Sequence, residues 1–271
     1  MVTGRVPFAA MLCLLATQAA SAATLFVPSN FSTIQDAINA AAPGDTIVVA
    51  PGFYVEQLDL LGKSLTIQSS GDASNTTISS TVGPLVRVSN ATSATLRGFT
   101  LTGVFGSTGS GGAILSQNSG LTVESCSFTS NSVIDGVGAA IFADGGSLTL
   151  RTSNFVTNGA AFIDAATSGV GAAVSINNAN ATITSSTFTG NVGTSMGGGA
   201  VGVTGASVVT VTTSTFENNA VNVPSGATTL GGGGAISVRD TATLTISGGS
   251  FSGNLSERGG VERSVSAPAA A

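Results

Sequence analysis

The sequence predicts an all-β protein, a right-handed parallel β-helix solenoid with a short amino-terminal capping helix. Three observations predict this fold: a Phe-x-x-Asn pattern that occurs five times, a glycine- and alanine-rich tetrad before each one, and a short alternating strand between the two. The last tetrad residue precedes its phenylalanine by 14 or 15 residues in every unit. Such constant spacing is typical of a structural repeat in which each unit forms one coil.

The chain begins with a pattern typical of a secretory signal peptide, residues 1–22. Arg5 supplies the positive charge, Phe8–Ala16 an apolar run, and Ala20–Ala22 the small residues of a cleavage site. We therefore expect an exported protein, extracellular or at the cell surface, with a β-helix domain over residues 23–261. No later stretch has the length of a transmembrane helix.

A short amphipathic helix is predicted over residues 32–42. Ser32 and Gln35 have the spacing of a capping box. The apolar residues of this segment share one face of the helix: Ile34, Ala37, Ile38 and Ala41. Pro43 and Gly44 end this helix, and residues 45–49 are expected to form the first strand. A helix in this position protects the open edge of a solenoid.

The five units share the same order of tetrad, strand and Phe-x-x-Asn. The tetrads are Gly111–Ile114, Gly138–Ile141, Gly171–Val174, Gly198–Val201 and Gly233–Ile236. The strands are Leu121–Val123, Leu148–Leu150, Ala181–Ile183, Val209–Val211 and Leu244–Ile246. The Phe-x-x-Asn segments are Phe128–Asn131, Phe155–Asn158, Phe188–Asn191, Phe216–Asn219 and Phe251–Asn254.

Alternation within each strand places its apolar residues on one face and its central threonine on the other. Stacking of coils should bring the five phenylalanines into one interior file, because equivalent residues then lie over one another. The asparagines are expected at turns with left-handed backbone angles, each bonded to its equivalent one coil away. Cys126 aligns with serines of later units and is interpreted as a small inward filler rather than a reactive thiol.

Spacing between units is variable on one side of the coil. Two longer loops, Gly159–Val170 and Ala220–Gly232, should protrude there, where repeat proteins usually carry binding function. At the carboxyl end, Gly259–Val261 resembles the start of a sixth tetrad, as expected of a fragment of a longer repeat array. Residues 262–271 are predicted to form a disordered tail.

Composition argues against nucleic acid as a partner. The net charge is −5, and the eight lysine and arginine residues are scattered rather than clustered, whereas phosphate neutralisation needs a basic patch. The chain has no histidine, which removes the commonest general base and metal ligand. After removal of the signal peptide one cysteine remains, so an internal disulfide is excluded.

The amino-terminal segments Phe31–Ile38, Pro43–Val49 and Pro51–Glu56 resemble the opening of the pectin-lyase-like superfamily, which includes pectin methylesterases. The tetrads and Phe-x-x-Asn segments resemble repeats of the polymorphic outer-membrane proteins of chlamydiae and related adhesins. Both resemblances imply a right-handed parallel β-helix. They do not specify an activity, because this superfamily hosts lyases, hydrolases, esterases, adhesins and non-catalytic proteins.

No catalytic, cofactor or metal site is predicted. The aspartate cluster with Gly-His-Gly of polygalacturonases is absent, and so are the esterase and lyase motifs of the superfamily. Asp144 and Asp240 follow their tetrads and are interpreted as polar turn residues, in a column with Gln117, Asn177 and Thr204. Asp135 and Asp164 fall in the variable segments, where Phe162 is the aromatic residue of the longer loops. Glu124 and Arg151 are positioned for an exposed ion pair.

The preferred hypothesis is a secreted or cell-surface, non-enzymatic β-helix protein that binds glycans or proteins through edge loops or its strand face. Two alternatives stay open. One is a lyase or hydrolase acting on pectin or other uronates. The other is an ice-binding solenoid, suggested by Thr122, Thr149, Thr182, Thr210 and Thr245 with Thr184 and Thr212 beside them. Glu124 and Arg151 interrupt the row to which Thr184 and Thr212 belong.

Overall fold

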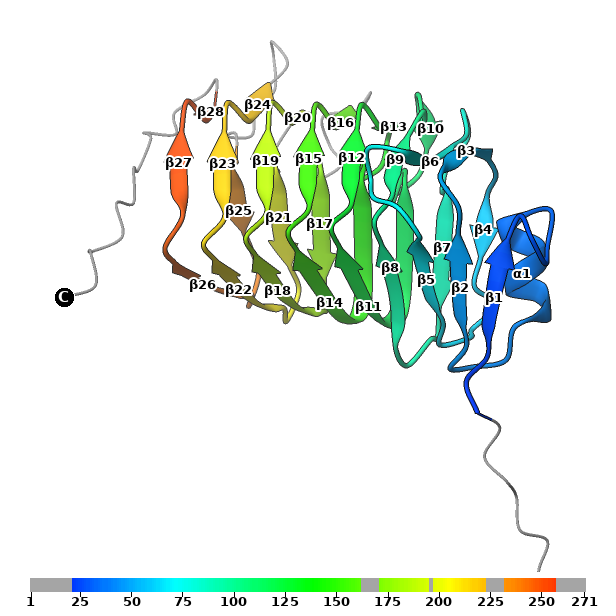
Figure 1. Cartoon of the computed structure of the whole chain (residues 1–271). Helices are drawn as coiled ribbons and strands as arrows, with labels where there is room; N and C mark the ends of the chain where they lie inside the picture. The colour runs from blue at the N-terminus through cyan, green and yellow to red at the C-terminus, as the bar shows by residue number, and fades with distance from the viewer. Residues whose placement is uncertain (1–20, 162–170, 195–196, 223–231, 257–271) are drawn as a thin grey trace, which may run out of the picture.

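In a computed structural model the chain winds into one parallel β-helix, seen from the side in Figure 1. The structure describes residues 21–161, 171–194, 197–222 and 232–256. Every strand pair in these segments is parallel, and the partners come from successive coils. The predicted parallel β-helix is therefore confirmed.

Three sheets run along the molecule. The 14-stranded sheet A contains β1 (Thr24–Val27), β2 (Thr46–Val49), β4 (Leu58–Asp59), β5 (Thr66–Ser69), β7 (Val86–Ser89), β8 (Ala94–Arg97), β11 (Ile114–Glu124), β14 (Ile141–Arg151), β17 (Val174–Asn177), β18 (Asn180–Thr184), β21 (Val201–Thr204), β22 (Val208–Thr212), β25 (Ile236–Val238) and β26 (Thr243–Ser247). The eight-stranded sheet B contains β3 (Gly52–Val55), β6 (Thr76–Ser79), β9 (Thr100–Thr102), β12 (Ser127–Thr129), β15 (Asn154–Val156), β19 (Thr187–Thr189), β23 (Thr215–Glu217) and β27 (Ser250–Ser252). The six-stranded sheet C contains β10 (Ser107–Thr108), β13 (Ser132–Ile134), β16 (Gly159–Ala161), β20 (Val192–Thr194), β24 (Ala220–Asn222) and β28 (Leu255–Ser256).

The tetrads hold the coils in register. Ile114 pairs with Ile141, which pairs with Val174, and the same column continues through Val201 to Ile236. The glycines that open the tetrads pass close to the backbone of the chain. Gly138, for example, has a φ of +62°, and a Cβ there would collide with the carbonyl oxygen of Ile141. A larger residue is therefore excluded at this turn.

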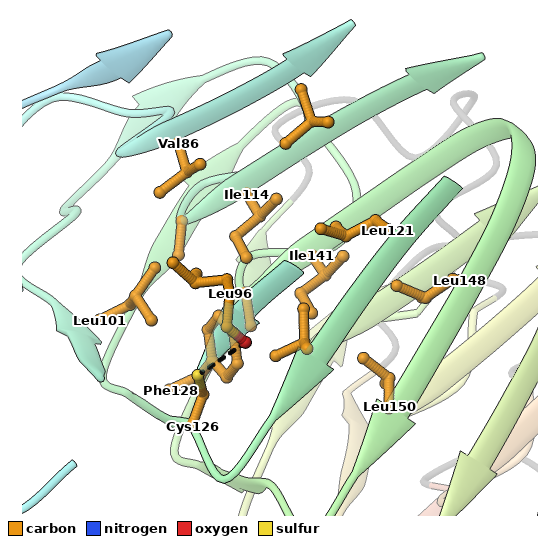
Figure 2. Packing of buried hydrophobic residues seen from close by; sticks show 14 of the residues in the cluster. Val86, Leu96, Leu101, Ile114, Leu121, Cys126, Phe128, Ile141, Leu148 and Leu150 are labelled. Atoms are coloured by element: carbon orange, nitrogen blue, oxygen red, sulfur yellow. Dashed lines mark hydrogen bonds between the residues drawn. The ribbon is translucent and has the colours of Figure 1, made fainter. Parts of the chain in front are cut away.

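The five phenylalanines form the predicted interior file. Phe128, Phe155, Phe188 and Phe216 are fully buried, and Phe251 packs against the core at the last coil. Successive ring centroids are 4.8, 4.6, 4.7 and 4.8 Å apart, with interplanar angles of 5° or less. These distances equal the spacing of neighbouring strands, about 4.8 Å, so one ring lies on each coil. Figure 2 shows Phe128 among the aliphatic side chains of this core.

The asparagines form a buried ladder between sheets B and C. The Nδ2 of Asn158 donates to the Oδ1 of Asn191 and to the carbonyl oxygen of Phe128, each at 3.0 Å. The expected bond to the equivalent residue is confirmed, but the expected left-handed angle is wrong. That angle belongs to the preceding residue, such as Thr157 with a φ of +52°, which turns the asparagine inward.

A second column lies between sheets A and B. Cys126 is buried, and its position is occupied in later coils by Ser153, Ser186 and Ser214. The thiol lies 3.4 Å from the carbonyl oxygen of Glu124, as the Ser153 hydroxyl lies 2.8 Å from that of Arg151. Burial raises the pKa of Cys126 to about 12. The structure thus places Cys126 as the inward filler that the alignment predicts.

The amino-terminal cap differs from its prediction in two details. The first strand is β1, which precedes the helix and pairs with β2, so residues 46–49 form the second strand. The helix α1 (Ile34–Ala40) is capped by Thr33, whose hydroxyl accepts from the backbone of Asp36, and not by Ser32. The carboxylate of Glu56 replaces the expected capping box, because it accepts the N–H groups of the first two helical residues. Figure 1 shows α1 beside β1 at one end of the β-helix.

The described segments also correct the start of the two longer loops. Gly159–Ala161 and Ala220–Asn222, expected to be loop, form strands β16 and β24 of sheet C. Residues 162–170 and 223–231 of these loops, with Phe162 and Asp164 among them, lie outside the described residues. The signal peptide and the carboxyl-terminal tail fall almost wholly outside them as well, so both stay predictions.

Candidate binding face

The carboxylates that the sequence singles out do not converge on one site. Asp144 lies on β14, whereas Asp240 follows β25, three strands farther along sheet A. Asp135 follows β13 on sheet C. Glu124 pairs in register with Arg97 on one side and Arg151 on the other, on the outer side of sheet A. The adjacency of Glu124 and Arg151 is confirmed, and their ion pair stays a prediction.

Asp144 belongs to the predicted polar column. It is in register with Gln117 and Asn177, and its carboxylate accepts a hydrogen bond of 2.8 Å from the Asn177 amide. Asp240 was expected in the same column, but this is wrong. Its φ of +57° and its hydrogen bond from the Gly205 backbone place it one residue farther on, in a turn column. Both aspartates therefore have structural partners.

Nothing in the described segments gathers metal ligands. Among residues 21–161, 171–194, 197–222 and 232–256, no group of three or more His, Cys, Asp or Glu side chains is placed to hold a metal ion. A small cavity inside the first coils is lined by eight apolar residues and Thr95, including Leu60, Val88 and Leu121. Such a lining offers little for acid–base chemistry.

One outward file of sheet A is made of threonine alone. Register pairing joins nine threonines from the first coil to the last, and we call this row the threonine file. Its members are Thr24, Thr46, Thr66, Thr95, Thr122, Thr149, Thr182, Thr210 and Thr245. Their strands β1, β2, β5, β8, β11, β14, β18, β22 and β26 succeed one another along the molecule in Figure 1.

From Thr66 onward, each file threonine lies between two apolar residues, as Thr122 lies between the buried Leu121 and Val123. All nine are half-buried or exposed. Their hydroxyls make no hydrogen bond to any other group of the described chain. Unpaired hydroxyl groups in these positions are available to solvent or to a ligand.

Sheet B presents hydroxyl groups too, but several of them are used within the protein. Thr100 donates to the carbonyl oxygen of Ala73 at 2.6 Å, and Thr102 donates to that of Thr129 at 2.7 Å. Thr187 bonds to the side chain of Asn154. The threonine file therefore differs from sheet B in leaving its hydroxyls free.

A neighbouring outward file, two residues farther along each strand, has a mixed composition. We call it the second file; it consists of Phe26, Val48, Gln68, Arg97, Glu124, Arg151, Thr184, Thr212 and Ser247. Because its backbone environment is the same, strand propensity alone does not require threonine at every outward position. The uniformity of the threonine file needs a further reason.

The sequence revealed only the carboxyl-terminal five members of this file. The amino-terminal coils lack the tetrad and the Phe-x-x-Asn segment, so their register could not be assigned from spacing. A usable signal was nevertheless present. Thr46, Thr66 and Thr95 each stand between two apolar residues or directly before one, as the later file members do.

No family model matches the sequence, and a search of curated proteins finds no match either. Among solved structures, the chain is similar to a crystal structure of the pectin methylesterase from Aspergillus niger. The similarity covers 92% of this chain and 93% of that chain, with 15% sequence identity and a TM-score of 0.43. The fold implied by the amino-terminal resemblance, a pectin-lyase-like parallel β-helix, agrees with the strand pairing described above. No helix in the described segments is long and apolar enough to cross a membrane.

Proposed function

We propose that the protein is an exported, non-catalytic β-helix that binds an extended, uncharged ligand through its threonine file. The observation that carries this proposal is the row of nine in-register threonines whose hydroxyls have no partner in the described chain. Export is supported by the signal-peptide pattern of residues 1–22.

The shape and chemistry of the file favour a ligand that repeats. Each coil adds one identical hydroxyl and methyl group, and backbone pairing fixes the interval between them. A ligand with the same interval gains one contact for each coil, whereas a small molecule would reach only one or two. Edge loops, the other surface expected from the sequence, contribute less to this proposal because most of their residues lie outside the described segments.

A non-catalytic role is supported by the positions of the acidic residues. General acid–base or metal chemistry needs groups that converge on one cleft. Asp144 instead bonds to Asn177 in a structural column, and Asp240 holds the turn at Gly205. Glu124 stands on the open face of a sheet between two arginines.

Retention on insoluble solids tests the proposal. Wild-type protein is mixed with microcrystalline cellulose, chitin or an ice slurry, or with calcium-pectate gel as a charged comparison, and the bound fraction is measured. Thr149→Lys places a long cation in the middle of the file and should reduce binding to the retained solid at least tenfold. The matched control Thr189→Lys changes an outward, half-buried threonine of sheet B and should leave binding unchanged.

Two results would overturn the proposal. Equal loss of binding in both variants would show that the threonine file is not the binding surface. Turnover of pectin, alginate or another uronate by wild-type protein, with loss of activity in Asp144→Asn or Asp240→Asn, would establish the polysaccharide-active alternative.

A further inference from the structure

We infer that the ligand of the threonine file is the ordered water of an ice crystal surface. The inference rests on the proposed function, because it names the ligand class for the same face. It starts from the interval between coils. The stacked rings measure this interval at 4.6–4.8 Å over four successive steps. Threonines of the file that lie on the same coils are joined by strand pairing, so they repeat at the interval of neighbouring strands.

Even spacing over many coils favours a crystalline ligand. A flexible polymer must lose conformational freedom to match nine fixed positions. A crystal surface repeats without such a loss, since its molecules are already ordered. The register pairs extend without interruption from Thr24 to Thr245, which provides the long, rigid template that such a surface requires.

The groups presented at each coil favour water over sugar or a charged ligand. A threonine hydroxyl donates one hydrogen bond and accepts up to two, so like water it can do both, while its methyl group restricts the orientation of nearby water. The file itself carries no charge, and Phe26 is the one aromatic side chain in the two files. Sugars are usually bound by aromatic stacking and charged polymers by ion pairing, and the threonine file offers neither aromatic rings nor charged groups for these contacts.

The carboxyl-terminal coils extend this array into a second direction. Thr182 and Thr184, Thr210 and Thr212, and Thr245 with Ser247 stand side by side on β18, β22 and β26. Alternate residues on a strand are separated by about 6.6 Å. Two parallel rows of hydroxyls can therefore match a plane of a crystal rather than a line. In the middle coils, Arg97, Glu124 and Arg151 occupy the second row instead.

These three charged side chains provide a gain-of-function test. Each holds its own hydration, which an ordered water layer would have to displace. Replacing all three (Arg97→Thr, Glu124→Thr and Arg151→Thr) would continue the double row over six successive coils. Threonine suits exposed strand positions, so the variant should fold; circular dichroism and thermal melting check this.

The measurements are thermal hysteresis and inhibition of ice recrystallisation by purified protein. Wild type should show measurable hysteresis, and the triple threonine variant should show severalfold more at equal concentration. Thr210→Lys should abolish most of the effect, while Thr189→Lys on sheet B should retain it. This order of hysteresis among wild type, the triple variant and the two lysine variants is specific to ice contact through the two files.

Absence of hysteresis and of ice retention in both wild type and the triple variant would overturn the inference. If wild type then binds cellulose or chitin and Thr149→Lys does not, the threonine file still serves as a binding face, with a polysaccharide as its ligand. Ice activity that survives Thr210→Lys unchanged would refute both the inference and the proposed function.

Discussion

At the scale of single residues, the column that a side chain occupies determines its role. Cys126 illustrates this, because serine takes its place in the following coils and bonds to the same kind of carbonyl oxygen. A reactive thiol requires exposure and a lowered pKa. Burial has the opposite effect and raises the pKa of Cys126 to about 12.

We predict that Cys126 is not modified by thiol reagents in the folded protein at neutral pH, since its thiol is protonated and buried. Cys126→Ser should change the free energy of unfolding by less than about 1.5 kcal/mol, because it conserves volume and fits the serine column. Mass spectrometry after iodoacetamide treatment, with and without urea, checks the first point. Rapid labelling without urea would contradict the buried position.

Asp45 ties the amino-terminal strand to the end of the helix. Its two carboxylate oxygens accept from the backbone of Ala23 at 2.7 Å and of Ala42 at 2.8 Å. These hydrogen bonds, that of Ala23 first, lower the pKa of Asp45 below its ordinary value of 3.8. The carboxylate therefore stabilises the fold fully above that pH, and the contribution is lost as the pH falls through the lowered pKa.

We predict that Asp45→Asn lowers the melting temperature at pH 7, and that the difference from wild type shrinks as the pH falls below 3.8. Thermal melts over a pH series measure this, with Glu217→Gln on sheet B as a control for general charge effects. A constant difference at all pH values would show that the ionised carboxylate is not responsible.

At the scale of the elements, the interior files hold adjacent coils together. The phenylalanine file continues toward the amino terminus as Leu101 and Ile78, which occupy the same column in register. The asparagine ladder ends at Asn131, and the buried Val104 occupies the coil before it. Aliphatic residues thus replace both repeats in the early coils without loss of strand pairing.

We predict that Phe155→Ala destabilises the protein by about 3–5 kcal/mol, because it leaves a cavity between two stacked rings. Phe155→Leu should be milder, since leucine occupies this column at Leu101. Urea denaturation measures the changes, and Val156→Ala, which points outward from the same strand, is the control. A larger loss in the control would contradict the inward orientation of Phe155.

Removal of one rung of the asparagine ladder should also be costly. Asn158→Ala leaves the buried backbone N–H of Asn131, and one of the two N–H groups of its side-chain amide, without an acceptor, at about 1–3 kcal/mol for each such group. Asn254→Ala, at the half-buried end of the ladder, should cost less. Urea denaturation of both variants checks the order, and a larger effect at Asn254 would contradict the ladder.

Sequence spacing predicted these elements where the repeat is strict and failed where it is not. The coils from Ile114 onward, the phenylalanine stack and the place of Cys126 followed from aligned residues. The capping role of Glu56 could not be predicted, because it depends on a contact between distant segments. The left-handed residue before each asparagine was missed because serine, threonine, asparagine and glycine all occupy that position.

At the scale of the whole molecule, the strand register places threonines that are distant in the sequence in one row on the surface. Five aligned threonines suggested a file, and strand pairing extends it to nine by adding Thr24, Thr46, Thr66 and Thr95. The absence of a recognisable catalytic motif limited what the sequence could say about chemistry. The proposed binding face depends on this long-range stacking, which no single repeat contains.

Electron paramagnetic resonance of paired spin labels tests this register most directly. In a Cys126→Ser background, labels at Thr149→Cys and Thr182→Cys should lie on adjacent coils, about 4.8 Å apart at the backbone, and broaden each other's spectra strongly. Labels at Thr149→Cys and Thr210→Cys, two coils apart, should broaden weakly. Because a slip of one residue would turn these side chains inward, unreactive cysteines or equal broadening in both pairs would contradict the structure.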